Sequence, residues 1–427
     1  MTGEKLPPPL TTYILAVIII AAFVVRLSFS LVAGGVGRGT DEDAYLSIAR
    51  NLAASWGYTD SSGQPTAYRS PLYPVLVAGV LKFSGGNLAV LAVLQAALGA
   101  LIAVVAAGIA DELAGRVAAI LAGALVACDP FLIYFSGEIM TETVFTFFVA
   151  GAVYFLLRSL RRPSVGRTCL AALFVAAAGL TRPIGWGLLP LAALFALAQR
   201  ASVGRRVASA LAVLLVGALA AAPWVIRNFI IFNAFIPNTT HGGYTFVLGN
   251  NPSLYDAMRR GEPWLRGSPS FDAFEKENAE ARQGKGEVAG DAEMWRRGKA
   301  FVREQPKAAL WLALKKIEAL WRPAPTGLSV RGIVPGFVRY ALGAFSLVLY
   351  AAATVGIISL KGKPLPLVLF LYCPALFTMT HAVFWSQLRF RVPLHPLLAA
   401  LAAAAVPFFL ALVRRDVKPC VESRASS

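Results

Sequence analysis

The chain has 427 residues, of which 57% are hydrophobic and 15% are charged, and its mean hydropathy is +0.63. Soluble domains carry about 25% charged residues, so the composition excludes an ordinary soluble protein and indicates a polytopic membrane protein. The net charge of +17 comes mostly from basic residues beside apolar runs. This pattern indicates membrane topology and a lipid bilayer with anionic headgroups as partner, and no nucleic acid.

The cysteines and histidines do not form a recognisable site. The four cysteines show no C-x-x-C spacing, and the three histidines lie far apart in the sequence. The sequence therefore indicates neither a disulfide framework nor a thiolate or histidine metal site. The first apolar run is long enough to remain in the membrane as a span, and the N-terminus lacks the pattern of a cleavable signal.

Ten apolar runs predict membrane-spanning helices, because about 20 apolar residues cross a bilayer and the backbone must bond within each span. Residues 168–199 count as two spans, since a single helix would be too long for one crossing and Thr181-Arg182-Pro183 interrupts it. Residues 71–84 are apolar but short, so we expect a helix near the outer interface. The ten predicted spans are 11–33, 87–110, 115–133, 139–157, 168–181, 183–199, 207–231, 337–360, 364–382 and 390–413.

The short connections between these spans are basic, at 158–167, 200–206 and 361–363, as is the stretch after the last span. The positive-inside rule places them, with both termini, in the cytoplasm. Four parts follow: an N-terminal transmembrane catalytic module at 1–231 with an outer loop at 34–86, a periplasmic segment at 232–336, C-terminal transmembrane helices at 337–413 and a cytoplasmic tail at 414–427.

The outer segment 232–336 is too long for a bare loop and should contain its own structure. Its end, residues 307–322, has helical periodicity. Leu310, Leu314, Ile317 and Trp321 fall on one stripe, and Lys315, Lys316 and Glu318 lie off it. This pattern predicts an interfacial amphipathic helix.

Three acids follow the first predicted span, Asp41, Glu42 and Asp43. One interpretation is a solvated cluster that caps the next helix. The other is catalytic, because a carboxylate in a partly dehydrated pocket suits the removal of a proton from an acceptor hydroxyl. Acids at a membrane surface, beside spans that hold an apolar molecule, suggest chemistry on a lipid-linked substrate.

A second acidic site is Glu138 to Glu142. Glu138 is expected to cap a helix start, whereas Glu142 lies at the outer end of a span. An ionisable group in a membrane is by default a functional candidate. Glu142 is therefore expected to orient an acceptor or a metal, with a wet helix-capping acid as the alternative.

Arginines also gather on the predicted outer face, against the positive-inside bias. Guanidinium groups match phosphate oxygens in a bidentate way, which favours phosphate binding; the alternatives are headgroup contact or pairing with the acids. Aromatic residues on the same face fit an interfacial belt, and some suit stacking on a sugar ring. The arginines are Arg69, Arg182, Arg227, Arg389 and Arg391, and the candidate substrate-binding tyrosines are Tyr45, Tyr68 and Tyr73.

The order of motifs along the chain resembles that of one family. Asp-Glu-x-x-Tyr follows the first span, then Ala-Tyr-Arg-Ser-Pro-Leu-Tyr-Pro, Met-Thr-Glu, Leu-Thr-Arg-Pro, Pro-Trp-Val-Ile-Arg-Asn, Gly-Asn-Asn-Pro and Arg-Phe-Arg-Val-Pro-Leu-His-Pro. From about residue 10 to residue 413, the chain resembles the bacterial relatives of dolichyl-phosphate-mannose protein mannosyltransferases, glycosyltransferase family 39, including the lipid A aminoarabinose transferase type.

This resemblance implies an all-α polytopic membrane protein of the GT-C fold, with the catalytic loop after the first span on the outer side. It implies an enzyme with a polyprenyl-phosphate sugar donor. Asp41 matches the family's catalytic aspartate, with Glu42 beside it, and Glu142 matches a second acidic position. Arg389 and Arg391 match a region near the donor phosphate. The site residues do not fix a cofactor, and a divalent metal is left open.

The expected reaction is an inverting transfer of the sugar to an envelope acceptor (a lipid, glycan or protein) at the periplasmic side of the inner membrane, with Asp41 as general base. A transporter or lipid flippase is the alternative, and it predicts charges near the midplane and internal repeats. The charges cluster at one face and no repeat is visible, which favours the enzyme. A non-catalytic scaffold that displays the outer segment is the third reading.

Overall fold

The computed structural model describes residues 8–32, 44–325 and 336–407. Within these ranges the regular secondary structure is helical, apart from one isolated β-bridge between Thr59 and Pro65. The predicted all-α membrane fold is therefore confirmed. The elements are α1 (Pro8–Val32), α2 (Tyr45–Ala53), α3 (Leu72–Phe83), α4 (Leu88–Ala114), α5 (Arg116–Ala127), α6 (Pro130–Ser136), α7 (Glu142–Arg161), α8 (Val165–Thr181), η1 (Pro183–Gly187), α9 (Leu188–Leu197), α10 (Val203–Phe232), α11 (Gly242–Gly249), α12 (Pro252–Arg260), α13 (Pro269–Arg282), α14 (Glu287–Glu304), α15 (Pro306–Trp321), α16 (Gly336–Ser359), α17 (Pro364–Val383) and η2 (Leu388–Leu394).

In the described ranges, seven helices are long and apolar enough to cross a membrane, and an eighth crossing arises if α5 and α6 form one bent span. The seventh of these runs from Leu388 to Pro407 and includes η2. Helices α8 and α9 correspond to the two short spans predicted at 168–199, but both are shorter than a standard crossing. The predicted count of ten is therefore not confirmed.

The bend between α5 and α6 has a local cause. Pro130 begins α6, and Asp129 caps it by accepting hydrogen bonds from the backbone N–H groups of Phe131 (2.9 Å) and Leu132 (3.1 Å). The other carboxylate oxygen of Asp129 lies 2.7 Å from Nδ1 of the buried His395. The same side chain therefore fixes the direction of α6 and joins it to the last helix of the described chain.

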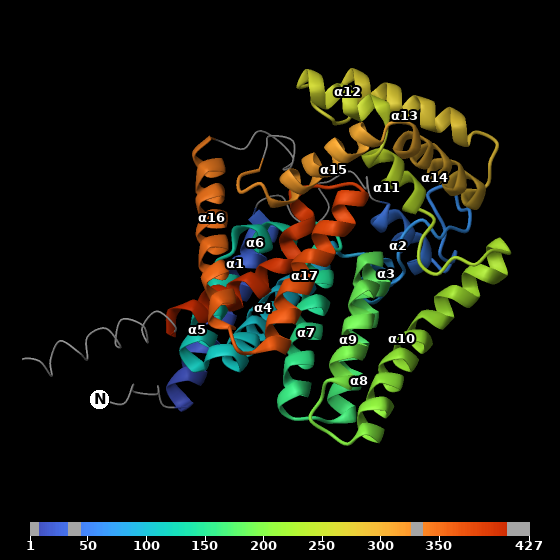
Figure 1. The fold of residues 1–427 in the computed structure, drawn as a ribbon. Helices are drawn as coiled ribbons and strands as arrows, with labels where there is room; N and C mark the ends of the chain where they lie inside the picture. Colours follow the sequence, from blue (N-terminus) through green and yellow to red (C-terminus); the bar gives the residue numbers. More distant parts are fainter. Residues whose placement is uncertain (1–7, 33–43, 326–335, 408–427) are drawn as a thin grey trace, which may run out of the picture.

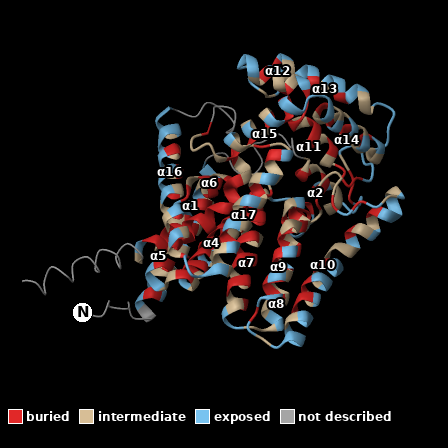
Figure 2. Cartoon of the chain, viewed as in Figure 1, coloured by how far each residue is buried: buried red, intermediate tan, exposed pale blue. Residues whose placement is uncertain are grey.

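The helices form a bundle with a cap over one end (Figure 1). The cap consists of α11 to α15, while the basic α7–α8 and α9–α10 loops lie at the opposite end of the bundle, in the lower part of the view. Within the apolar stretch of each helix, 67% of α7 is buried inside the protein, but only 17% of α1 and 28% of α10 are buried. Figure 2 shows the same contrast between buried central helices and exposed outer ones, as expected where outer helices face lipid.

The predicted helix at 307–322 is present as α15, and a residue off its apolar stripe makes a buried contact with the protein. Leu310 and Leu314 of the predicted apolar stripe are 64% and 59% exposed, whereas Lys316 is buried. The Lys316 ammonium donates to the carbonyl oxygens of Gly249 (3.0 Å) and Val383 (3.2 Å). Because lipid and protein interior are both apolar, the stripe did not reveal which face of α15 would contact protein; Lys316 joins α15 to α11 and α17.

Candidate active site

A cavity of about 890 Å³ lies between the bundle and its cap. Its walls come from the α2–α3 connection, the α6–α7 connection, the break between α8 and η1, helix α11 and the segment that joins α17 to η2. Segments far apart in the sequence therefore meet at one place, where the apolar bundle borders the polar cap.

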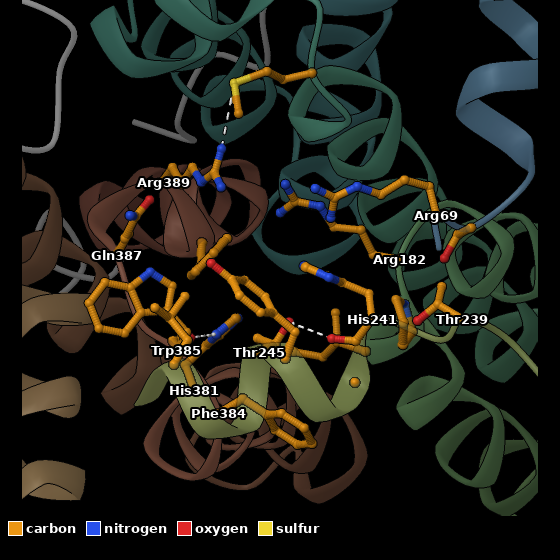
Figure 3. Close-up of a pocket in the computed structure, with 18 of the residues that line it drawn as sticks. Arg69, Arg182, Thr239, His241, Thr245, His381, Phe384, Trp385, Gln387 and Arg389 are labelled. Carbon is orange, nitrogen blue, oxygen red and sulfur yellow. Dashed lines mark hydrogen bonds between the residues drawn. The ribbon is translucent and has the colours of Figure 1, made fainter. Parts of the chain in front are cut away.

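Four arginines line this cavity: Arg69, Arg182, Arg389 and, from the cap, Arg266. Arg69, Arg182 and Arg389 come from three separate parts of the chain, and in Figure 3 their side chains extend toward the same space. The predicted substrate-binding residues Tyr45 and Tyr68 line the cavity as well, and both rings face the Arg69 guanidinium at centroid distances of 5.1 and 4.9 Å.

Glu142 lies behind two of these arginines. Its side chain is fully buried at the start of α7, and Oε1 accepts a hydrogen bond from Nη2 of Arg182 at 2.6 Å. The same oxygen lies 3.9 Å from Nε of Arg389. Glu142 is not among the residues that line the cavity. Its position therefore fits the orientation and charge balance of two arginines better than direct contact with an acceptor.

The break at Arg182 is formed as the sequence predicts. Helix α8 ends at Thr181, and Arg182 has extended backbone angles before Pro183 begins η1. Gly185 lets η1 approach closely, since a Cβ there would lie 2.4 Å from the carbonyl carbon of Ala178. Arg182 thus leaves the helix and donates from Nε to Thr141 Oγ1 at 2.5 Å.

The loop that carries Arg69 is held by two other side chains. Tyr58 donates its hydroxyl hydrogen to the carbonyl oxygen of Arg69 at 2.9 Å, and burial raises the pKa of Tyr58, which keeps that donor protonated. Arg227 donates to the carbonyl oxygens of Tyr58 (2.9 Å) and Thr66 (2.7 Å). Both contacts fix the backbone beside the cavity.

Three residues predicted for the site lie elsewhere. Arg227 donates its hydrogen bonds to the loop carbonyl oxygens named above. Arg391 is buried and donates to the carbonyl oxygens of Leu320 (2.9 Å) and Arg322. Tyr73 is fully buried and donates to Gln95 Oε1 at 2.9 Å. Arg227 and Arg391 carry the same guanidinium as their neighbours, but backbone carbonyls already satisfy them, so they serve the fold at these positions.

Asp41, Glu42 and Asp43 lie outside the described residues. Among the cavity-lining residues of the described ranges, Glu138 is the one acid. No group of three or more His, Cys, Asp or Glu side chains suited to a metal ion occurs within residues 8–32, 44–325 and 336–407.

Several lining residues were not predicted: His241, Thr245, His381, Phe384 and Gln387. His381 stacks on Phe390 with a centroid distance of 4.5 Å, and its Nδ1 lies 2.9 Å from the carbonyl oxygen of Trp385. Tyr244 and Trp385, two aromatic residues of the predicted outer face, also line the cavity. Little in the sequence marks these residues as members of a site. They come from the outer segment and from the turn after α17, and the sequence does not show that these two parts lie close together.

Comparisons with known proteins point to one fold. A family profile described as dolichyl-phosphate-mannose-protein mannosyltransferase matches residues 68–226, which include Arg69 and Arg182. Comparison with curated protein sequences gives no match.

Among solved structures, the oligosaccharyltransferase AglB from the archaeon Archaeoglobus fulgidus, in complex with an inhibitory peptide and a dolichol-phosphate, aligns with a TM-score of 0.55 and 16% identity over 97% of this chain and 52% of that chain. The apo form of the Archaeoglobus fulgidus oligosaccharyltransferase gives 0.57 and 17% over 96% and 52%. ArnT from Cupriavidus metallidurans bound to undecaprenyl phosphate gives 0.42 and 16% over 92% and 77%. The chain thus spans about half the length of the archaeal enzymes, and it has the fold of the GT-C glycosyltransferases.

Proposed function

We propose that the chain is a membrane glycosyltransferase that moves a sugar from a polyprenyl-phosphate donor to an envelope acceptor, with inversion, at the periplasmic side of the inner membrane. The observation that carries this proposal is the convergence of Arg69, Arg182 and Arg389 on one cavity at the end of an apolar bundle.

The arginines suit the phosphate of such a donor. Guanidinium groups bind phosphate oxygens through paired hydrogen bonds, and positioned charges stabilise the negative charge that develops on a leaving phosphate. The donor's apolar chain would lie against the lipid-facing helices, which expose many large aliphatic side chains. The archaeal AglB structure, which has the same fold, is described as a complex with a dolichol-phosphate.

The proposed reaction is a single displacement. The acceptor hydroxyl oxygen forms a bond to the anomeric carbon, while the bond from that carbon to the phosphate oxygen breaks and its electron pair stays with the phosphate. The hydroxyl proton passes to the carboxylate of Asp41, whose role follows from the family resemblance and from its place after the first span. Arg182 and Arg389, with Glu142 behind them, stabilise the departing phosphate.

A transfer assay tests the proposal. The full chain in lipid nanodiscs is supplied with a radiolabelled polyprenyl-phosphate sugar and an envelope extract, and labelled products are separated by class. We expect wild-type protein to transfer label and Asp41→Asn to be folded but inactive, with Asp43→Asn as the matched control that retains activity. Turnover near the wild-type level in Asp41→Asn would refute the role of Asp41, and no donor consumption by the wild type with any donor sugar would refute the function.

A further inference from the structure

The cavity extends from the arginines to a second region under the cap. We infer that this region is the acceptor subsite and that it takes a carbohydrate, a hydroxylated pyranose ring, rather than a peptide. This inference rests on the proposed function and specifies the acceptor that the same site would use.

Aromatic rings form much of this region. The Tyr68 and His241 rings lie 4.3 Å apart between centroids, and His241 is stacked with Tyr244 at 5.3 Å, so that three lining rings follow one another. Phe384 and Trp295, which also line the cavity, lie 5.7 Å apart. Rigid aromatic faces in a partly enclosed cavity suit the apolar C–H faces of a sugar ring, since they bury area at a small cost in side-chain entropy.

Neutral hydrogen-bonding groups line the same cavity, on the side of Arg389. In the described part of the chain, neither the Gln387 amide nor the Trp385 indole N–H has a hydrogen-bond partner, and in Figure 3 both lie on the same side of the cavity as Arg389, opposite His241. The amide supplies two N–H donors and an acceptor, and the indole supplies one donor. Such uncharged groups match sugar hydroxyls, which both donate and accept.

Charged groups near this region do not fit a cationic ligand, and the cap contributes a cation, Arg266, to the cavity wall. Behind the wall, Glu287 accepts from the Ala67 backbone N–H at 2.7 Å, and Asp291 accepts from the Gly243 N–H at 2.6 Å. These acids hold the wall and are not among the residues that line the cavity. The lining acid of the described ranges, Glu138, comes from the α6–α7 connection and not from the cap.

A peptide acceptor finds less support in the same region. Extended peptides commonly bind by adding a strand to a sheet edge, where main-chain hydrogen bonds give affinity. Across the described ranges the chain has no β-strand, and its one β-bridge lies in the α2–α3 connection. Strand addition therefore has no sheet edge in the described ranges, and the aromatic faces with an amide on the same cavity wall favour a ring with hydroxyls.

The kinetic test uses full-length protein in nanodiscs, a labelled polyprenyl-phosphate sugar, and two acceptor panels: methyl and octyl glycosides, and short peptides that contain Ser and Thr. We expect label on glycosides. We expect Gln387→Ala and Trp385→Leu to raise the acceptor KM by about 5- to 10-fold, as for the loss of one hydrogen bond or one aromatic contact, with an unchanged donor KM. The matched control is Trp56→Leu, because Trp56 is 70% exposed and does not line the cavity.

A binding measurement separates this inference from the proposed function. Saturation-transfer NMR with methyl α-D-mannopyranoside, methyl β-D-glucopyranoside and a Thr-containing tetrapeptide needs no donor. We expect signals from the glycoside ring protons that weaken in Gln387→Ala and Trp385→Leu and persist in Trp56→Leu. Peptide signals without glycoside signals, label on peptides, or glycoside signals insensitive to both substitutions would overturn the inference. Glycoside binding without any consumption of donor would instead count against the proposed function.

Discussion

Arg182 is the cavity arginine with the most completely defined contacts. Thr141 and Glu142 hold two of its nitrogens, and Nη1 makes no hydrogen bond to any described residue. We expect Arg182→Gln to lower kcat on the order of 10²–10³-fold, as for the loss of one charge-stabilising donor. Arg182→Lys should recover part of the rate, because it keeps the charge but not the fork. Initial rates against donor concentration measure both.

The control for this prediction is Arg259→Gln, since Arg259 is exposed on α12 and outside the cavity. It should leave kcat and the donor KM unchanged. Equal rates for Arg182→Gln and the wild type would show that Arg182 does not stabilise the leaving group.

Glu142 and Arg182 form a buried ion pair, and removal of one partner leaves the other charge without compensation. We expect Glu142→Ala to lower the free energy of unfolding by about 3–5 kcal/mol, because an unpaired buried charge is costly. Thermal unfolding in detergent, followed by size-exclusion chromatography, measures the loss.

Glu112 provides the comparison for Glu142. It pairs with Arg158 and Arg161, whose side chains are 36% and 60% exposed. Exposed pairs contribute about 0–1 kcal/mol, so Glu112→Ala should change stability little. Equal losses in both variants would argue that the burial of the Glu142 pair has no energetic consequence.

At the level of single residues, the sequence located part of the cavity. Arg69, Arg182 and Arg389 were recognisable because the positive-inside rule makes cations uncommon at an outer face, so their presence there suggested an anionic ligand. Arg227 and Arg391 shared that signal, yet backbone carbonyls of the loop at Tyr58 and of the end of α15 satisfy them. A guanidinium that binds phosphate and one that binds carbonyl oxygens look the same in a sequence. Only tertiary contacts separate them.

Among the elements, α14 supports the cavity wall through two carboxylates, Glu287 and Asp291, which accept backbone hydrogen bonds. Burial raises the pKa of Asp291 from 3.8 to about 6, although it accepts a hydrogen bond from the Gly243 N–H. Between pH 3.8 and about pH 6, the folded protein therefore binds more protons than the unfolded chain. The resulting stability is fully present below pH 3.8 and is lost as the pH rises through about 6.

Asp291→Asn should remove this dependence, because the amide oxygen still accepts from Gly243 and carries no charge. We expect the variant to unfold at a higher temperature than the wild type at pH 8, by a few degrees for an effect on the order of 1 kcal/mol, with a difference that shrinks toward pH 5. Asp291→Ala, which loses the acceptor, is the matched comparison and should be less stable than Asp291→Asn at pH 8. Parallel curves for the wild type and Asp291→Asn would contradict the prediction.

The positions of most helices followed from the sequence. Which face of a helix contacts protein and which contacts lipid did not. The break at Thr181-Arg182-Pro183 separates α8 from η1 as the proline predicts. Helix α15 begins and ends within one residue of the predicted 307–322. Periodicity gives the helix, but in a membrane protein an apolar stripe faces lipid or protein with equal ease, so the exposure of Leu310 and the burial of Lys316 required the tertiary structure.

In the whole molecule, the two ends of the bundle differ in a way that predicts orientation. The basic α7–α8 and α9–α10 loops lie at the end opposite the cap. The positive-inside rule assigns the basic end to the cytoplasm, so the cap and the cavity should face the outer side of the membrane. A donor whose phosphate binds the cavity arginines would then react on that side.

Cysteine labelling in intact cells tests this orientation. In a chain whose four native cysteines are replaced by serine or alanine, Lys276→Cys places a thiol on exposed α13, and Ser202→Cys places one just before α10. We expect a membrane-impermeant maleimide to label Lys276→Cys in cells whose outer membrane alone is permeabilised, and Ser202→Cys only after lysis. Both positions are exposed, so a difference in labelling reports the side of the membrane rather than burial. The reverse pattern would place the arginine cavity in the cytoplasm, where the proposed periplasmic reaction does not occur.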